Sequence, residues 1–232
     1  MKLFAISDLH LSGGCRKPMD IFGSHWEGHW EKIAADWREK VGENDAVAIC
    51  GDISWAMKYD EFEPDISAIR SLPGKKVMIR GNHDYWHTSL AKTRAMLDEH
   101  TFFLQNDCVE IGGAVFAGAR GWQQEDADRF DSNDRKIYDR ELGRLRMSLE
   151  AAAKKKKPII VLIHFPPFSR SFSESPFTEL IEQYGVSAVL YGHIHGAAAL
   201  SKVYANVKLN VIRYVLTSCD HLRFSLKEID IF

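Results

Sequence analysis

Short apolar runs recur along residues 1–195, and each is followed within a few positions by Asp, Asn or His. The runs occupy residues 3–6, 46–50, 77–79, 159–163 and 188–191. Their length and their content of β-branched and small apolar residues predict strands that are buried on both faces. The polar residues at their ends are then predicted to lie where the strands leave the sheet.

Longer amphipathic stretches separate the first of these runs. Trp26–Lys40, Glu61–Ser71 and Thr88–Glu99 carry apolar residues at helical spacing, and Pro73-Gly74 ends the second of them. An alternation of short strands with helices is typical of an α/β (α+β) protein, in which helices cover a parallel or mixed sheet.

The second half of the chain contains more strands. Thr101–Leu104, Cys108–Ile111 and Ala114–Ala117 are predicted strands, with a turn at Gly112-Gly113. The polar segment 121–138 is predicted to be a loop, and Tyr138–Lys155 a helix. Beyond His195 the sequence is β-rich without an obvious helix, and three segments suit antiparallel strands of a second sheet: 198–204, 207–216 and 222–231.

Composition places the chain among ordinary globular proteins. Of its 232 residues, 45% are apolar, and no linker or internal repeat divides them, so a single domain over residues 1–232 is expected. The net charge of −2 gives no general basic field, which makes nucleic acid an unexpected partner. The four cysteines are widely spaced and form no C-x-x-C pair, which excludes a zinc ribbon.

No apolar run reaches the length of a membrane span, and no signal peptide is visible before the first predicted strand. A cytoplasmic protein without a membrane partner is therefore expected. Composition leaves the oligomeric state open.

Seven residues at the strand ends are candidate metal ligands: Asp8, His10, Asp52, Asn82, His164, His193 and His195. Ligands gather at the carboxyl ends of strands in α/β sheets. Oxygen and nitrogen donors without thiolate favour Mn, Fe or Zn at a reactive site over a structural zinc. Seven ligands exceed the need of one tetrahedral ion. If one carboxylate bridges, they can serve two ions and leave positions for water.

Each fragment alone is weak evidence, since a single histidine beside a strand is more often structural. Asp8 and His10 lie two apart, which sends both side chains to one side of an extended segment. Gly51 permits a sharp bend before Asp52. Gly81-Asn82-His83-Asp84 and Gly192-His193-Ile194-His195 are much rarer by chance, so the combined set predicts a metal centre.

This ordered set resembles the calcineurin-like metallophosphoesterase superfamily over residues 1–196. The resemblance implies a four-layer sandwich of two mixed β-sheets flanked by helices. It also implies a hydrolase of the bacterial phosphohydrolase type, which cleaves a phosphomonoester or phosphodiester with metal-activated hydroxide.

The resemblance also assigns roles to single residues. Asp8, His10, Asp52 and His195 would hold one ion, and Asp52, Asn82, His164 and His193 the other, so that Asp52 bridges. His83 would be catalytic and face the oxygen of the leaving group. Asp84 would orient His83.

One departure from the family concerns the phosphate. Protein phosphatases of this superfamily carry Asp-Arg-Gly three residues after the aspartate of Gly-Asp, whereas Ile53-Ser54-Trp55 follows Asp52 here. A small phosphorylated substrate is therefore expected instead of a phosphoprotein. Arg120, between Gly118 and Gly121, is a candidate phosphate ligand; the alternative is an ion pair with an acid in 125–134. His87 is a candidate for substrate contact.

Two other functions compete with a small-molecule hydrolase. A protein-binding scaffold that had lost catalysis should also have lost one or more ligands, and this chain retains all seven. A nuclease should have a basic groove lined by aromatic residues. The six tryptophans are compatible with such a groove, but the net acidity argues against DNA.

Overall fold

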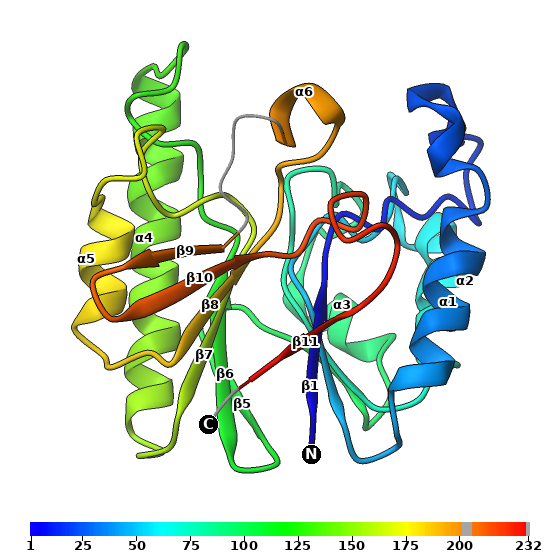
Figure 1. Cartoon of the computed structure of the whole chain (residues 1–232), viewed down its shortest axis with the longest axis horizontal. Coiled ribbons are helices and arrows are strands. Elements are labelled where there is room, and N and C mark those ends of the chain that lie inside the picture. Colours follow the sequence, from blue (N-terminus) through cyan, green and yellow to red (C-terminus); the bar gives the residue numbers. More distant parts are fainter. Residues whose placement is uncertain (201–205, 231–232) are drawn as a thin grey trace.

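The computed structural model describes residues 1–200 and 206–230, and it shows two β-sheets packed face to face between two layers of helices (Figure 1). This arrangement confirms the four-layer sandwich of mixed sheets that was expected from the sequence.

The first sheet has the strand order β11-β1-β2-β3-β4. Strands β1 to β4 are parallel, whereas β11 runs antiparallel to β1 at the edge. The strands are β1 (Leu3–Ile6), β2 (Ala46–Ile49), β3 (Lys75–Met78), β4 (Thr101–Phe103) and β11 (Lys227–Ile229). In register, Leu3 lies opposite Ala46 and Ile6 opposite Ile49, so that β1 and β2 end side by side.

The second sheet has the order β5-β6-β7-β8-β10-β9. Its four central strands are parallel, and β5 and β9 are antiparallel to their neighbours. The strands are β5 (Cys108–Ile111), β6 (Ala114–Ala119), β7 (Ile159–Ile163), β8 (Ala188–Tyr191), β9 (Asn206–Leu209) and β10 (Ile212–Leu216).

The helices pack on the outer faces of the two sheets. The first sheet is covered by α1 (His29–Lys40), α2 (Tyr59–Arg70) and the short α3 (Leu90–Ala95), and the second by α4 (Ser132–Ala153) and α5 (Pro176–Glu182). Two 3-10 turns, Met19–Phe22 and Ser24–Trp26, precede α1, and α6 (Ala197–Leu200) follows β8. Within the described residues, no helix combines the length and the apolar character that crossing a membrane requires.

Alternate residues of each strand enter different hydrophobic cores. Phe4 and Ile6 of β1 face the outer helices, whereas Leu3 and Ala5 point toward the second sheet. Between the sheets, the central strands of the first sheet present small side chains, namely Ala5, Ala46 and Ala48, and the second sheet presents Phe116, Leu162 and Leu190. These residues are fully buried. Their close packing fixes the relative position of the two sheets, and hence of the loops at their ends.

Two predicted helix starts need correction, and one helix was missed. Helix α4 begins at Ser132, so part of the predicted loop 121–138 is helical; Asp131 and Asp134 form a capping box that satisfies the first backbone N–H groups. Helix α1 begins only at His29, because Gly28 has a left-handed backbone conformation (φ 60°). Helix α5, capped by Ser175, was not predicted.

The strands predicted after His195 were only partly right. Residues 197–200 form α6 and not a strand, and residues 201–204 of the predicted strand 198–204 lie outside the described part. The segment 207–216 is a hairpin that turns at Asn210, and its second strand runs parallel to β8. Finally, β11 extends the first sheet and not the second, because it pairs with β1.

Candidate metal centre

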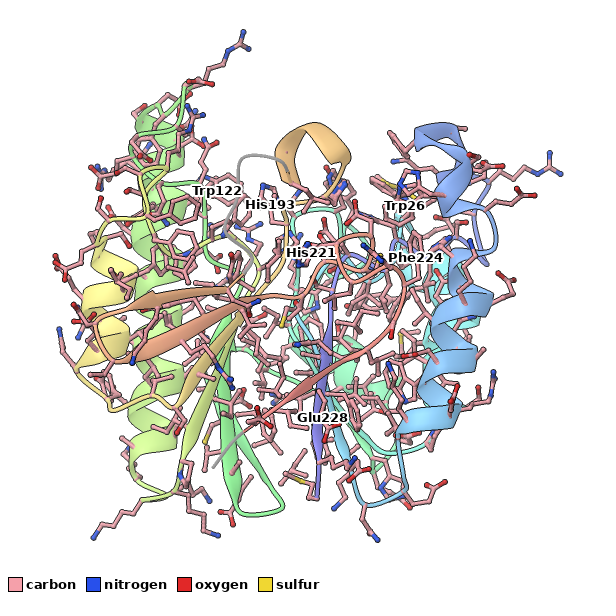
Figure 2. The ribbon with its side chains drawn as sticks, viewed as in Figure 1. Trp26, Trp122, His193, His221, Phe224 and Glu228 are labelled. Carbon is pink, nitrogen blue, oxygen red and sulfur yellow. The ribbon has the colours of Figure 1, made fainter. Side chains whose placement is uncertain are left out.

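The carboxyl ends of β1, β2 and β3 meet those of β7 and β8 at one edge of the sandwich, where His193 lies in Figure 2. Ligand atoms of Asp8, His10 and His195 lie within 4.8 Å of one another, and so do those of Asp8, Asp52 and His164. Residues that are far apart in the sequence thus form two overlapping groups that share Asp8.

The backbone at this edge is held in an uncommon conformation. Asp8, His10, Asp52 and His193 have φ values of 57°, 46°, 51° and 71°, in the left-handed region that residues other than glycine seldom adopt. Such conformations cluster at functional sites because the surrounding structure must maintain them. They turn the side chains at the strand ends toward one another.

Backbone hydrogen bonds hold the loops after β1 and β2 together. The N–H groups of Asp8 and His10 donate to the carbonyl oxygens of Gly51 and Asp52, each at 3.0 Å. A Cβ at Gly81 would lie 2.1 Å from Asp52 Oδ1, and a Cβ at Gly192 would lie 2.5 Å from Ser7 Oγ. Glycine is therefore required at both positions, because the ligand loops pass too close for any side chain.

Buried polar atoms without partners lie where the two groups adjoin. Neither ring nitrogen of His10 has a hydrogen-bond partner, and neither has Asp52 Oδ2, which lies 3.7 Å from His10 Nε2. Burial lowers the pKa of His10 well below its usual value, so the ring is neutral and carries a free lone pair. Buried polar atoms without partners are costly. A bound cation would satisfy them, and these donors fit one.

Asn82 joins His164 of the second group to His193. Its Oδ1 lies 2.7 Å from His164 Nε2 and 2.9 Å from His193 Nδ1, and His164 Nε2 is 3.4 Å from Asp52 Oδ2. His164 Nδ1 is 2.9 Å from the carbonyl oxygen of Cys50. If Nδ1 carries the proton and donates it there, Nε2 is free to bind a metal, as is usual for metal-binding histidines.

Electrostatics also favour a cation in this second group. Burial is the largest single effect and lowers the pKa of His164, but the Asp52 and Asp8 carboxylates and the Cys50 carbonyl oxygen together outweigh burial and raise that pKa to about 9. The carboxylates therefore attract positive charge to the point where His164, Asn82 and Asp52 meet. Asp52 Oδ2 lies 3.7 Å from His10 Nε2 and 3.4 Å from His164 Nε2, so this residue of the second group also faces the first. Asp8 belongs to both groups, and the two carboxylates therefore lie between them.

Asp8 is held by its own neighbours. Ser7 Oγ donates a hydrogen bond of 2.6 Å to its Oδ2, and the His193 N–H lies 3.1 Å from both carboxylate oxygens. Burial raises the pKa of Asp8, while His164 opposes this effect. The carboxylate thus links β1 to the loop after β8, which joins the two sheets at the site.

His83 lies beside the ligands. Its N–H donates to Asp52 Oδ1 at 2.8 Å, and its ring lies 5.6 Å from the ring of His10 and 4.6 Å from that of Trp55. Its Nδ1 is buried and has no hydrogen-bond partner.

Asp84 organises the loops around the site. It accepts hydrogen bonds from Gly81 N (2.7 Å), Ile53 N (2.9 Å), Ser54 N (3.2 Å) and Trp86 Nε1 (2.9 Å). Burial and the nearby Asp52 charge raise its pKa to about 6. No hydrogen bond among the described residues joins Asp84 to His83. The geometry thus supports a positioning role for Asp84, which ties the loops after β2 and β3 together.

The two candidate substrate ligands point elsewhere. Arg120 donates to Glu141 at 3.2 Å and lies over the Trp122 ring, and its side chain is only 11% exposed. Its acidic partner belongs to α4 and not to the segment 125–134. The ring nitrogens of His87 lie 2.7 Å from Thr93 Oγ1 and 3.1 Å from Gln105 Oε1, inside the protein. Neither arrangement supports contact with a substrate.

Sequence reasoning gave no role to Lys17 or Trp55. The Lys17 Nζ lies 3.3 Å from the centre of the Trp55 ring, which stacks on His10 with a centroid distance of 4.4 Å. Lys17 also lies close enough to lower the pKa of His83, although burial is the larger cause. An exposed cation therefore stands beside the ligands. The pair is invisible to a motif search because its two members are far apart in the chain.

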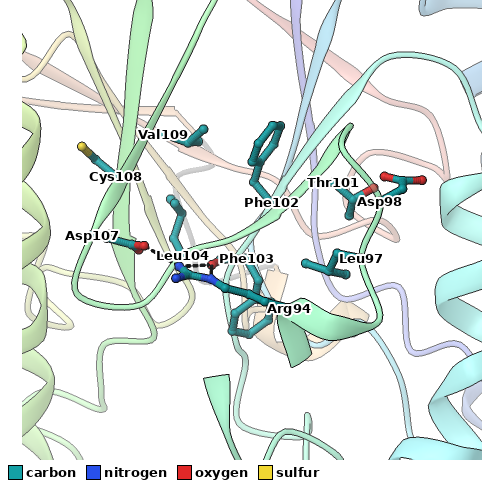
Figure 3. Close-up of a pocket in the computed structure, with 10 residues that line it drawn as sticks. All are labelled: Arg94, Leu97, Asp98, Thr101, Phe102, Phe103, Leu104, Asp107, Cys108 and Val109. Carbon is teal, nitrogen blue, oxygen red and sulfur yellow. Dashed lines mark hydrogen bonds and ion pairs between the residues drawn. The ribbon is translucent and has the colours of Figure 1, made fainter. Parts of the chain in front are cut away.

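Two clefts differ in their relation to these ligands. A cleft of about 730 Å³ is lined by His193, Phe165 and Phe168, among others, and so opens onto the candidate centre. A smaller one of about 290 Å³ lies between α3, β4 and β5 (Figure 3). There Arg94 pairs with Asp107 and donates to the carbonyl oxygen of Phe103. No candidate metal ligand lines the smaller cleft.

Comparison with solved structures reveals the same fold in distant proteins. The phosphopantetheinyl hydrolase from Mycobacterium tuberculosis aligns with a TM-score of 0.59 and 17% identity, over 98% of this chain and 95% of that one. Protein AQ665 from Aquifex aeolicus aligns with a TM-score of 0.51 and 14% identity over the same shares. At these identities the likeness concerns the fold alone.

Two sequence comparisons address the family. Gene 66 protein of Mycobacterium phage L5 is 36% identical over 83 residues, which are 35% of this chain and 39% of the phage protein. The alignment thus spans about two fifths of that relative. The family model described as calcineurin-like phosphoesterase matches residues 1–197, which include all seven candidate ligands. With this match and the geometry of the site, the chain belongs to the calcineurin-like phosphoesterase family.

Proposed function

We propose that this protein is a metal-dependent phosphoesterase that uses two metal ions to hydrolyse a phosphomonoester or phosphodiester of a small molecule. The observation that carries the proposal is the convergence of unpartnered donors: both nitrogens of His10 and Asp52 Oδ2 are buried, and they face the ligand atoms of Asp8 and His164. Without a cation, these atoms would be a net cost to folding.

In this proposal, each ion takes its ligands from both sheets. Asp8, His10 and His195 hold the first ion, Asn82, His164 and His193 hold the second, and Asp52 bridges them. When bound, such ions lower the pKa of a water molecule and neutralise the charge of the phosphate oxygens. The mixed oxygen and nitrogen donors suit Mn, Fe or Zn.

Two neighbouring residues complete the proposed machinery. His83 has an unpartnered Nδ1, and its backbone N–H is fixed on Asp52, so it can transfer a proton to the departing oxygen. Lys17 replaces Arg120 as the proposed cation for the phosphate, because it is exposed, and the ring beneath it stacks on His10. A lysine ammonium serves here as a point charge.

The test is a substrate panel. Protein stripped with a chelator and reloaded with Mn, Fe, Zn, Ni or Mg is assayed on nitrophenyl mono- and diesters and on alkyl phosphates. A phosphopantetheinyl ester is included because of the structural neighbour. Hydrolysis that depends on metal, and that Asp52→Asn abolishes, supports the proposal. A protein that binds two ions but cleaves no ester would instead favour the scaffold.

A further inference from the structure

The cleft of about 730 Å³ beside His193 has an apolar wall. Phe165 lies against the His193 ring with a centroid distance of 4.1 Å, and Phe168 and Phe172 pack on each other at 5.2 Å. Pro166 and Ile194 add further apolar lining. The volume falls within the roughly 300–1,000 Å³ of small-molecule sites. The apolar wall is thus continuous with the candidate metal centre through Phe165 and His193.

Polar groups at the rim of this cleft are engaged with the protein itself. The side-chain amide of Gln124 donates to the carbonyl oxygen of Pro166, and that of Gln123 to the carbonyl oxygen of Arg129. The Arg170 guanidinium pairs with Asp128, and the backbone N–H of Arg170 donates to Asp126. The rim thus carries two carboxylates and one guanidinium, so it provides no surplus positive charge for a second anionic group of a ligand.

We infer that this cleft binds an uncharged, largely apolar organic group attached to the phosphate of the substrate. The inference rests on the proposed function, since the phosphate itself would lie at the metal centre. Phe165 at the junction would contact the first atoms of that group, and Phe168 and Phe172 the more distant ones. Phosphate esters of sugars would leave this apolar wall without a partner.

A series of 4-nitrophenyl alkyl phosphodiesters tests the inference. The leaving group stays constant while the alkyl chain lengthens from methyl to octyl, so only apolar burial changes. We expect kcat/KM to rise by up to about fourfold per methylene until the wall is covered. A parallel series of alkyl phosphomonoesters shows whether the same cleft accepts the leaving group. Equal kcat/KM along both series overturns the inference.

The variant Phe172→Ala tests whether the apolar wall binds the alkyl chain of these esters. Phe172 is only partly buried, whereas Phe168 also packs against Tyr191 and Tyr214, so removing the Phe172 ring leaves more of the core intact. We expect about a tenfold loss of kcat/KM on the octyl ester and less than twofold on the methyl ester. Met147→Ala, at an exposed site of α4, should change neither value. Equal losses on both esters in Phe172→Ala would contradict a role in apolar binding.

Binding to metal-free protein provides a readout that needs no activity. We expect 1-naphthol, titrated in a calorimeter, to bind parent protein and to bind at least about fivefold more weakly to Phe172→Ala. Absence of measurable binding, or equal binding by both proteins, overturns the inference. If 1-naphthol binds as expected but no ester is cleaved, the cleft is retained and the proposed function fails.

Discussion

The two sheets contribute unlike chemistry to the same site. The first sheet supplies Asp8, Asp52 and Asn82, all oxygen donors, with His10 as its imidazole, and beside them the exposed Lys17. From the second sheet come three imidazoles and an apolar cleft. On this side Arg120 pairs with Glu141, and Arg170 at the rim of the cleft pairs with Asp128. The carboxylate ligands thus lie on one side of the centre, and most of the imidazole ligands lie on the other.

This difference indicates that the two sheets contribute unequally to metal binding. A carboxylate brings a negative charge to a metal ion, whereas an imidazole binds the ion through a nitrogen lone pair. The loops of the first sheet are held by hydrogen bonds to Asp84 and between β1 and β2. The predictions below test whether the first side carries the greater share of metal binding and catalysis.

The largest effect is expected at the bridging carboxylate of the first side. Asp52→Asn should lose both ions and abolish hydrolysis, because the amide removes the charge that faces His10 and His164. His193→Ala, on the second side, should lose only one ion. Elemental analysis of the purified proteins measures both losses, with Asp60→Asn at an exposed site as the control. If Asp52→Asn retains both ions, Asp52 does not bridge them.

A smaller but still large effect is expected for His83. Replacing it with Ala should lower kcat by roughly 10²–10⁴-fold, the usual contribution of a positioned general acid. Metal content should stay at the parent level, because the ring itself is not a ligand. The loss should be smaller for nitrophenyl esters than for alkyl esters, whose leaving groups need a proton more. Equal losses for both kinds of ester would assign His83 another function.

Lys17 should have a moderate effect. Lys17→Met retains the contact of the side chain with Trp55 but removes the charge, so KM should rise about tenfold, as expected for a charged hydrogen bond of roughly 1.5 kcal/mol. Lys17→Arg should restore most of the parent KM. Steady-state kinetics on one good substrate measure both variants. An unchanged KM in Lys17→Met would show that Lys17 does not bind the substrate phosphate.

The smallest effect on catalysis is expected on the second side, at Arg120. Arg120→Ala should change kcat and KM by less than about twofold, because the guanidinium is engaged with Glu141. Thermal or denaturant unfolding should instead show a loss of about 1–2 kcal/mol, less than the loss of a whole buried pair, since Arg144 still contacts Glu141 at 2.8 Å. A tenfold rise in KM at full stability would restore Arg120 as a phosphate ligand.

The sequence predicted buried strands best, because a continuous apolar run is a strong local signal. Buried strands such as β7 are continuous apolar runs, and their carboxyl ends carry the ligands, so the sheets and the seven candidates could be recognised. Helix ends were less predictable, because the capping of α4 by Asp131 depends on local hydrogen bonds within a polar segment. The partner of Arg120 and the contact of Lys17 with Trp55 depend on tertiary packing, which leaves no trace in spacing.

The small residues between the sheets have a consequence for the chemistry at their edge. Ala5, Ala46 and Ala48 allow the first sheet to approach Leu162 and Leu190 closely, and β7 and β8, which carry those leucines, end at the histidine ligands. The small size of these alanines therefore sets the distance between the oxygen donors of the first sheet and the nitrogen donors of the second. A larger side chain at Ala48 would widen the gap between the donors and weaken metal binding without touching a single ligand.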